Sequence, residues 1–386
     1  MNILFAHDLT LKVYKNNYYS LGTINKDIME RYLIGNDKIY IYARQVKAIE
    51  EPKQLSNINT ENIICIPSNI YHSPTDYFMK HNNLKTEVQK ALKGINFCVV
   101  RLPSFLGGIV YEEAKKIGIP CMVELVGCPW DSLWYYGGIK AKLFAPIMYY
   151  KTKKEIKNSK YVVYVTKEYF QNKYPTKGKN INCSNVNIEN VSDDILESRV
   201  NKIKSSNNTY KIGLMGSLNV KYKGQDTAIK AISLLKNKFN IELHFLGSGD
   251  KENWIDLIKQ YGVENSVFFD GTLPAGDPVY NWLDNMDIYL QPSLTEGLPR
   301  SVIEAMSRGC PVIGTEAGGI PELLQKELVI KKKDYKDLAI KIEKLLNAKK
   351  MMEKIAKENF EEAKKYNKSL LNEKRRKFIE EVYNNK

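Results

Sequence analysis

The sequence predicts an α/β protein with doubly wound parallel sheets, and two observations support that fold class. Short apolar runs rich in β-branched and aromatic residues alternate with stretches of helical spacing, as in a parallel sheet covered on both faces. This alternation stops near residue 177 and starts again near residue 210. Because 386 residues suffice for two domains, each half is expected to form its own sheet.

In the first half, strands are expected over the apolar runs at residues 1–6, 38–43, 97–101, 121–126 and 161–165. Residues 23–33 and 109–117 have helical spacing, and Gly118 and Pro120 separate the second of these helices from the next strand. The polar segment 177–208 is rich in Asn, Ser and Lys and lacks strong periodicity. It is the predicted linker.

In the second half, strands are expected at residues 211–218, 241–247, 266–271, 287–293 and 311–315. Helical spacing lies between the first four of them, at residues 224–237, 251–261 and 278–285. The charged tail from residue 334 onward is also helical in spacing. The predicted architecture is therefore two Rossmann-like halves followed by a helical tail.

The chain is strongly basic, with 58 Lys and Arg against 44 Asp and Glu and a formal net charge of +14. This charge favours an anionic partner, but no nucleic-acid recognition motif occurs, so nucleic acid is not expected. Six cysteines without a C-x-x-C pair argue against a zinc site or a redox dithiol. The apolar run before Asp8 is too short for a signal peptide or a membrane span. We expect a cytoplasmic protein, with only peripheral contact to the inner face of the membrane.

The densest signal is at residues 296–324, which read EGLPRSVIEAMSRGCPVIGTEAGGIPELL. A predicted strand ends before it, a loop carries Glu296 and Gly297, and Pro299 suits the first turn of a helix. Glu296 thus lies at the carboxyl edge of the second sheet, beside a helix N-terminus that favours phosphate. Glu304, two turns into that helix, can accept hydrogen bonds from vicinal hydroxyls such as those of a ribose. Taken singly, either glutamate is better explained as an ordinary solvated acid, but that explanation does not suit the assembled string.

This motif resembles the donor-site signature of GT-B glycosyltransferases of family 4, the retaining group 1 class, in which two glutamates serve the nucleotide-sugar. The resemblance is strong over residues 210–324 and general before them. It implies two Rossmann-like domains facing a central cleft. The acceptor-binding domain would comprise residues 1–190, the donor-binding domain residues 191–365, and a final helix at residues 366–386 would return to the first domain.

The resemblance implies that Glu296 contacts the transferred sugar and that Glu304 holds the ribose. In the turn at residues 216–224, Lys223 matches the family lysine that neutralises the diphosphate, and it is the second catalytic candidate beside Glu296. Ser217 stands where the family usually has an arginine. Lys221 is a candidate for the second cation, with a solvated lysine as the equal alternative. The remaining donor-binding candidates are Gly216, Ser217, Gly297, Leu298, Leu273 in the turn around the nucleobase, and Gly22, which an ordinary turn would equally explain.

On the acceptor side, the family normally supplies a histidine near the transferred sugar, but residues 123–131 contain none. Asp131 or Glu124 is a candidate polar contact in its place, and a buried acid held by hydrogen bonds explains either residue equally well. Arg101 is the third candidate. A weaker similarity, through residues 101–104 and 127–131, links this region to bacterial capsule and surface-polysaccharide enzymes.

No Asp-x-Asp pair is present, although GT-A enzymes use one to hold a divalent metal on the diphosphate. Its absence, with lysines at the phosphate turn, favours a reaction with no catalytic metal and no cofactor. We expect metal-independent retaining transfer from a nucleotide diphosphate sugar, with UDP as the expected nucleotide, to a glycan or lipid-linked glycan. The alternatives are a nucleotide-sugar epimerase on the same fold and a non-catalytic protein that binds a nucleotide-sugar or partner enzymes.

A basic stretch at residues 139–161 interleaves lysines with apolar side chains. As an amphipathic helix, it would dock the acceptor domain on an anionic membrane through Lys151, Lys153, Lys154 and Lys157. The alternative is a helix that packs on the core and directs its lysines into water.

Overall fold

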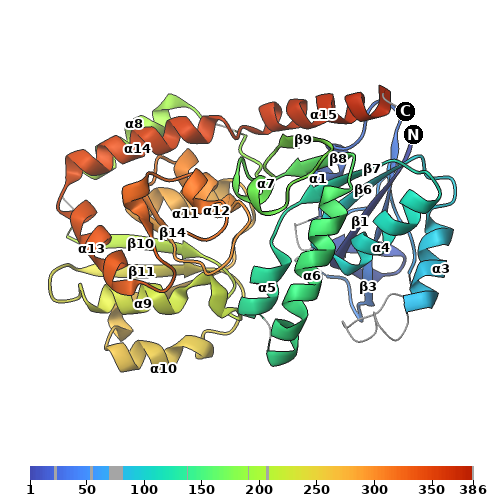
Figure 1. Ribbon diagram of the computed structural model, residues 1–386. Coiled ribbons are helices and arrows are strands. Elements are labelled where there is room, and N and C mark those ends of the chain that lie inside the picture. The colour runs from blue at the N-terminus through green and yellow to red at the C-terminus, as the bar shows by residue number, and fades with distance from the viewer. Residues whose placement is uncertain are drawn as a thin grey trace.

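The computed structural model describes residues 1–20, 24–52, 55–68, 81–136, 138–189, 191–205 and 208–384. It shows two α/β domains side by side, each built on a largely parallel sheet, as the sequence predicts (Figure 1). Within the described residues, no helix has both the length and the apolar character needed to cross a bilayer.

The first sheet has nine strands in the described residues, and its parallel part runs in the order β5-β3-β1-β6-β7-β8-β9. β2 and β4 extend it with antiparallel pairing. Every residue of β6 is buried, because helices cover both faces of the sheet. The strands are β1 (Asn2–Tyr14), β2 (Asn17–Ser20), β3 (Lys38–Lys47), β4 (Ser56–Asn57), β5 (Ile63–Cys65), β6 (Phe97–Leu102), β7 (Cys121–Leu125), β8 (Tyr161–Tyr164) and β9 (Lys179–Asn182).

The helices of the first domain follow its strands in the chain and differ in length from the predictions. The helix expected at residues 109–117 begins earlier, because the Ser104 hydroxyl accepts a hydrogen bond from the Gly107 amide and caps it. The helices are α1 (Lys26–Glu30), α3 (His81–Ala91), α4 (Phe105–Lys116), α5 (Pro129–Tyr136), α6 (Ile139–Lys157) and α7 (Tyr169–Lys173).

The second sheet is entirely parallel, in the order β12-β11-β10-β13-β14-β15. Counted along the chain this is 3-2-1-4-5-6, the Rossmann order, in which the direction of the connections reverses between β10 and β13. The strands are β10 (Tyr210–Met215), β11 (Ile241–Leu246), β12 (Val267–Gly271), β13 (Ile288–Gln291), β14 (Val312–Thr315) and β15 (Val329–Ile330).

The helices of the second half comprise those that cover this sheet and three that end the chain. Four short 3-10 helices accompany them in the described residues: η1 (Lys221–Lys223), η2 (Glu264–Ser266), η3 (Ile320–Glu322) and η4 (Lys326–Leu328). The α-helices are α8 (Asp193–Lys204), α9 (Gln225–Ser233), α10 (Glu252–Tyr261), α11 (Asp277–Asn285), α12 (Arg300–Ser307), α13 (Tyr335–Leu346), α14 (Lys349–Lys364) and α15 (Lys368–Asn384).

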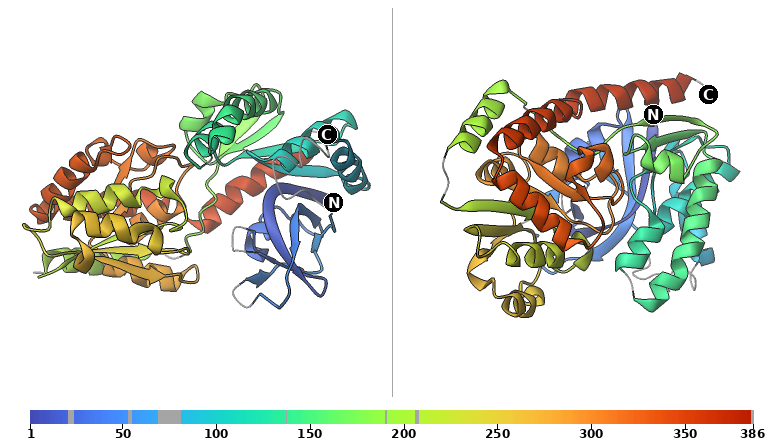
Figure 2. Two further views of the ribbon diagram at one scale, coloured as in Figure 1. Left: turned by 90° about the horizontal axis from the view of Figure 1, so that it is seen from below. Right: turned by 60° about the vertical axis from the view of Figure 1, so that its left-hand side comes forward.

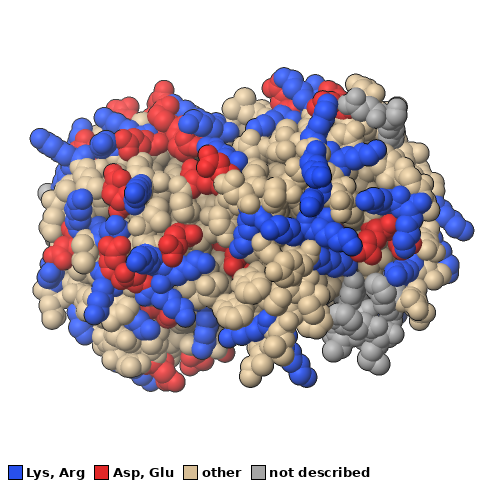
Figure 3. Space-filling view, viewed as in Figure 1, with Lys and Arg blue, Asp and Glu red and all other residues tan. Residues whose placement is uncertain are grey.

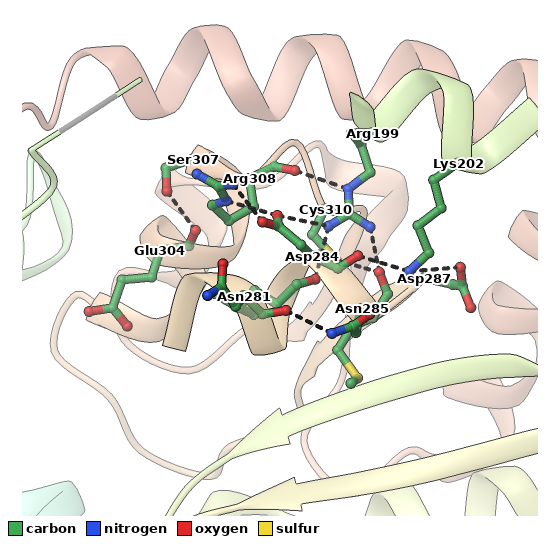
Figure 4. Close-up of polar contacts among 12 residues, drawn as sticks. Arg199, Lys202, Asn281, Asp284, Asn285, Asp287, Glu304, Ser307, Arg308 and Cys310 are labelled. Atoms are coloured by element: carbon green, nitrogen blue, oxygen red, sulfur yellow. Dashed lines mark hydrogen bonds and ion pairs between the residues drawn. The ribbon is translucent and has the colours of Figure 1, made fainter. Parts of the chain in front are cut away.

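The prediction of an irregular linker at residues 177–208 is wrong, because β9 and α8 lie within it. β9 is an edge strand without a buried face, and α8 buries only Arg199 and Ile203, so neither shows the expected apolar period. The Arg199 guanidinium attaches α8 to the second domain by donating to three backbone carbonyls, those of Leu283, Met286 and Arg308 (Figure 4).

Helix α15 leaves the second domain and lies on the first, as both views of Figure 2 show. Its aromatic side chains pack on the first sheet, with Tyr383 against Phe97 and Phe378 against Tyr161. The fully buried Arg375 places its Nε 3.5 Å from Oε1 of Glu124.

Glu124 and Arg101 lie inside the first domain and not on the acceptor side of a pocket. Arg101 Nη2 is 3.1 Å from Glu124 Oε2, and both residues are buried. Burial by itself raises the pKa of Glu124, but attraction to Arg101 and Arg375 outweighs it and the pKa is lowered. The structure therefore favours the alternative of a buried acid held by its partners, and the acid fastens α15 to the sheet.

Replacing Arg375 by alanine should strongly destabilise the first domain. The change removes one of the arginines that compensate the buried Glu124, and breaking a buried ion pair costs about 3 to 5 kcal/mol. The measurement is urea denaturation of the full chain. Arg376→Ala is the matched control, because Arg376 is exposed and pairs with Glu380 at the surface, where loss of an ion pair costs about 1 kcal/mol or less. Equal losses in both variants would contradict the prediction.

Candidate functional site

The site begins where the loops after β10 and β13 meet, at the reversal point of the second sheet. Ligands of open α/β sheets bind at this point, outside the carboxyl ends of the strands. Gly224 has φ +82°, and a Cβ there would lie 2.1 Å from the Pro292 carbonyl oxygen. The Leu294 amide also donates to the Tyr222 carbonyl at 2.8 Å. Glycine thus allows the two loops to touch, which brings Lys223 to Glu296.

Lys223 and Glu296 form an ion pair, with Nζ 2.7 Å from Oε1. The same oxygen accepts hydrogen bonds from Ser293 Oγ at 2.7 Å and Gln291 Nε2 at 2.8 Å. Burial lowers the pKa of Lys223, but the attraction of Glu296 exceeds that effect and raises it. Lys223 is therefore a cation at neutral pH.

A buried network of polar side chains holds the Glu296 carboxylate in place. Gln291 Oε1 accepts hydrogen bonds from the Tyr289 hydroxyl and from Ser301 Oγ, each at 2.9 Å. The Tyr289 hydroxyl in turn accepts one from the Met215 amide at 3.2 Å. Sequence reasoning missed Gln291 and Ser293, although two polar residues closing an apolar strand were a usable signal. The network orients the carboxylate before any ligand is bound.

Glu304 lies on α12, and Figure 4 shows its carboxylate pointing away from the ion pairs around Asp284 and Arg308. Among the described residues no hydrogen bond reaches that carboxylate, and only its backbone oxygen accepts one, from Ser307 Oγ. Burial raises the pKa of Glu304, and the charge of Arg300 opposes this. A half-buried acceptor without a protein donor is suited to ligand hydroxyls.

A pocket of about 230 Å³ lies between the two domains and includes Lys223 and Glu296 in its wall. The first domain contributes the loop after β7 and the start of α5. Here the backbones meet closely, because a Cβ on Gly297 would lie 2.3 Å from the Val126 carbonyl oxygen. The residues lining the pocket are Val126, Gly127, Cys128, Ser132, Tyr222, Lys223, Thr295, Glu296 and Gly297.

Asp131 is not in the pocket wall, because its carboxylate is turned toward α7. It is 3.1 Å from Lys173 Nζ and accepts a 3.3 Å hydrogen bond from the Tyr169 hydroxyl. Ser132, one residue later, lines the pocket together with Cys128, the residue before α5, whose carbonyl accepts a hydrogen bond from the Ser132 amide. Ser132, which directly follows the segment without the family's histidine, thus lines the same pocket as Glu296.

The other predicted donor-site residues differ in their placement. Lys221 is exposed at the start of η1, whereas Gly216 lies against the alkyl chain of Lys223. The Ser217 hydroxyl accepts a hydrogen bond from the Asn219 amide at 3.3 Å. Leu298 is buried, Leu273 is exposed after β12, and Gly22 lies outside the described residues. No three His, Cys, Asp or Glu side chains gather as metal ligands in the described part of the chain.

Glu322 joins the two domains beside this pocket, a role that sequence reasoning missed. Its carboxylate accepts hydrogen bonds from three consecutive amides of the first domain, those of Lys167, Glu168 and Tyr169, at 2.5, 3.1 and 2.6 Å. The amides lie at the N-terminus of α7, where unpaired N–H groups favour an anion. We refer to this contact as the Glu322 latch.

Comparison with known proteins agrees with this geometry. A family model described as glycosyl transferases group 1 matches residues 197–362. Protein CapJ of Staphylococcus aureus is 38% identical over 366 residues, which cover 95% of this chain and 90% of CapJ. The capsular polysaccharide biosynthesis glycosyltransferase CapM of the same species is 30% identical over 43% of each chain. The structure of HepE from Anabaena in complex with UDP-glucose has a TM-score of 0.68 at 15% identity, covering 99% of this chain and 100% of HepE.

The fold and the paired loops of the second sheet define a GT-B glycosyltransferase. The extent of the similarity to CapJ, with the matching family model, then shows that this chain belongs to the group 1 glycosyltransferase family. The family resemblance drawn from residues 296–324 is thereby confirmed.

Replacing Gly297 by alanine should lower turnover about a hundredfold. The new Cβ would be forced against the Val126 carbonyl oxygen, so the loop carrying Glu296 must shift, and a displacement of about 1 Å can cost that factor. Donor hydrolysis without acceptor measures the effect. Gly138→Ala is the control, since no atom lies within 4 Å of a Cβ at that position. Unchanged hydrolysis by Gly297→Ala would show that the close approach is not needed.

Proposed function

We propose that this chain transfers a sugar, with retention and without metal, from a UDP-sugar to a glycan or lipid-linked glycan acceptor in bacterial surface-polysaccharide synthesis. One observation carries the proposal: Lys223 and Glu296 are paired on the wall of a pocket between the domains, at the reversal point of the second sheet. The name of CapM supports a capsule-type product, and the UDP-glucose bound to HepE supports the donor. The retaining part of the proposal is supported by the resemblance of residues 296–324 to the retaining group 1 class.

Lys223 would stabilise the leaving diphosphate. When the bond between the sugar carbon and the diphosphate oxygen breaks, that oxygen gains negative charge. A lysine ammonium has three N–H donors, and the contact with Glu296 uses one of them. Two donors remain for a ligand, and a fixed cation in a partly buried site stabilises developing charge more than it does in water.

Glu296 would orient the transferred sugar. Its Oε1 receives three donors, from Lys223, Gln291 and Ser293, whereas no hydrogen bond to Oε2 involves the described residues. The saturated oxygen fixes the carboxylate, and the second oxygen is free to accept from sugar hydroxyls. Ser132 would meet the same sugar or the acceptor from the opposite wall.

Glu304→Ala should weaken UDP binding roughly tenfold to hundredfold, because loss of a charge-assisted hydrogen bond to the ribose costs about 1.5 to 3 kcal/mol. Calorimetry with UDP measures the dissociation constant. Glu264→Ala is the control, since Glu264 is an exposed acid on η2 in the same domain. A folded Glu304→Ala variant that binds UDP as well as the wild type would remove this residue from the site.

The UDP affinity of the wild type should also fall on acidification. Burial raises the pKa of Glu304, so its carboxylate takes up a proton at a higher pH than an ordinary glutamate and then loses acceptor capacity. The glutamine of Glu304→Gln cannot titrate, so the UDP affinity of that variant should not fall through protonation at residue 304. Parallel calorimetric titrations across acidic pH would test the difference, and identical profiles would contradict it.

Lys223→Ala should lower kcat more than it raises the donor KM, because the charge that Lys223 meets grows in the transition state. Turnover of the wild type should survive excess EDTA. Donor hydrolysis is the assay, with the exposed Lys251→Ala as a control in the same domain. Activity abolished by EDTA and restored by manganese would overturn the metal-free part of the proposal.

A further inference from the structure

Helix α6 presents a continuous apolar stripe to solvent. Ile139, Leu143, Ile147 and Tyr150 are exposed by 80, 71, 58 and 69%. Their spacing of four, four and three residues places them on one face of the helix. The opposite face is buried on the first domain through Ala145, Met148, Thr152, Glu155 and Ile156. We call the exposed face the α6 stripe.

The size of the α6 stripe distinguishes it from the other exposed apolar residues. Ile340 and Leu234 are exposed apolar side chains with no other such residue near them in the chain, which is normal for a soluble protein. Trp134 of α5 is also exposed and stacks on Trp130, which in turn contacts Tyr149 of α6. A contiguous apolar patch of this kind marks an interaction surface.

The same face of α6 carries positively charged side chains next to the apolar ones. Lys154 and Lys157 follow Tyr150 at helical spacing and are exposed, with no ion pair among the described residues. Lys142 lies over the Trp134 ring at 5.6 Å, so it borders the patch. The only acid within α6 is Glu155, which is buried. Figure 3 shows lysine and arginine side chains gathered next to an uncharged surface around α6.

The structure separates the four lysines that the sequence treats as one cluster. Lys151 lies within ion-pair distance of Glu112 and Glu155, and Lys153 lies over the Tyr149 ring. These two are therefore committed to contacts within the domain. Lys154 and Lys157 remain as the lysines on the line of the α6 stripe.

We infer that the α6 stripe docks the first domain on an anionic lipid membrane, with its apolar side chains in the interface and its lysines against lipid phosphates. An apolar face with cationic flanks is what such a surface binds. A second copy of the chain is a poorer match, because two stripes would bring lysines together without a carboxylate between them. This inference goes beyond the proposed function, since binding requires no donor and no turnover.

The stripe also lies close to the chemistry. α6 packs on α5 through Tyr149 and Trp130, and α5 contributes Ser132 to the wall of the pocket. A membrane bound to α6 would therefore lie next to the wall of the pocket that the first domain contributes. A lipid-linked acceptor could reach that side while its lipid remains in the membrane.

Co-sedimentation of the full chain with vesicles tests the inference. Vesicles of phosphatidylcholine with phosphatidylglycerol are compared with pure phosphatidylcholine, at low and moderate salt. Wild type should bind only the anionic vesicles, and more weakly as salt rises. Leu143→Ser with Ile147→Ser, and separately Lys154→Glu with Lys157→Glu, should each weaken binding at least about tenfold. Melting curves and UDP affinity should match wild type in both double variants.

The controls carry the same kinds of substitution on the second domain. Ile340→Ser removes an exposed isoleucine of α13, and Lys350→Glu with Lys357→Glu reverses two exposed lysines of α14. Both should bind anionic vesicles like wild type. Absence of wild-type binding, or equal losses in the controls, would overturn the inference. So would a wild-type dimer in solution that the Leu143→Ser, Ile147→Ser variant converts to monomer, because the stripe would then be an interface between copies.

Discussion

The ion pair between Lys223 and Glu296 is the interaction on which the site depends. It exists because the Rossmann order places β10 beside β13, so that two loops far apart in the chain leave the sheet together. Gly224 lets these loops touch, and Gln291 with Ser293 holds the carboxylate from the buried side. Because Gly224, Gln291 and Ser293 hold the charged pair in place, its side chains are already ordered before a ligand binds, and binding loses little further conformational entropy there.

This ion pair can act on a bound ligand only because the first domain forms the opposite wall of the pocket. Gly297 touches the loop after β7, and α15 crosses from the second domain to the first, where Arg375 meets the buried Glu124. The pocket wall is thus assembled from both halves of the chain, and its shape depends on contacts well away from it. Substitutions in α15 and at residue 297 should therefore have the same effect. Both change how the carboxyl edge of the first sheet is placed relative to the carboxyl edge of the second sheet.

The sequence predicted the parallel sheets well, because apolar strand runs and glycine-containing turns are local signals. It also singled out Lys223 and Glu296, which the structure brings together, while the role expected of Glu304 stays a prediction. It could not predict that Asp131 turns to Lys173 while Ser132 faces the pocket, since helix phase and tertiary packing decide between adjacent residues. β9 and α8 were missed for a related reason. β9 lies at a sheet edge, and α8 is held largely by polar contacts of Arg199 and Lys202 with only Ile203 as a buried apolar residue.

The Glu322 latch has a thermodynamic consequence for movement between the domains. Its three hydrogen bonds lie near the surface, so separation of the domains would exchange them for bonds to water and not leave them unmade. Because the acceptor is a carboxylate, each such exchange costs about 1.5 to 3 kcal/mol. The free energy by which the latch favours this arrangement of the domains is similar to the free energy that binding of one ligand can supply. Substrate binding can therefore shift the equilibrium between open and closed arrangements.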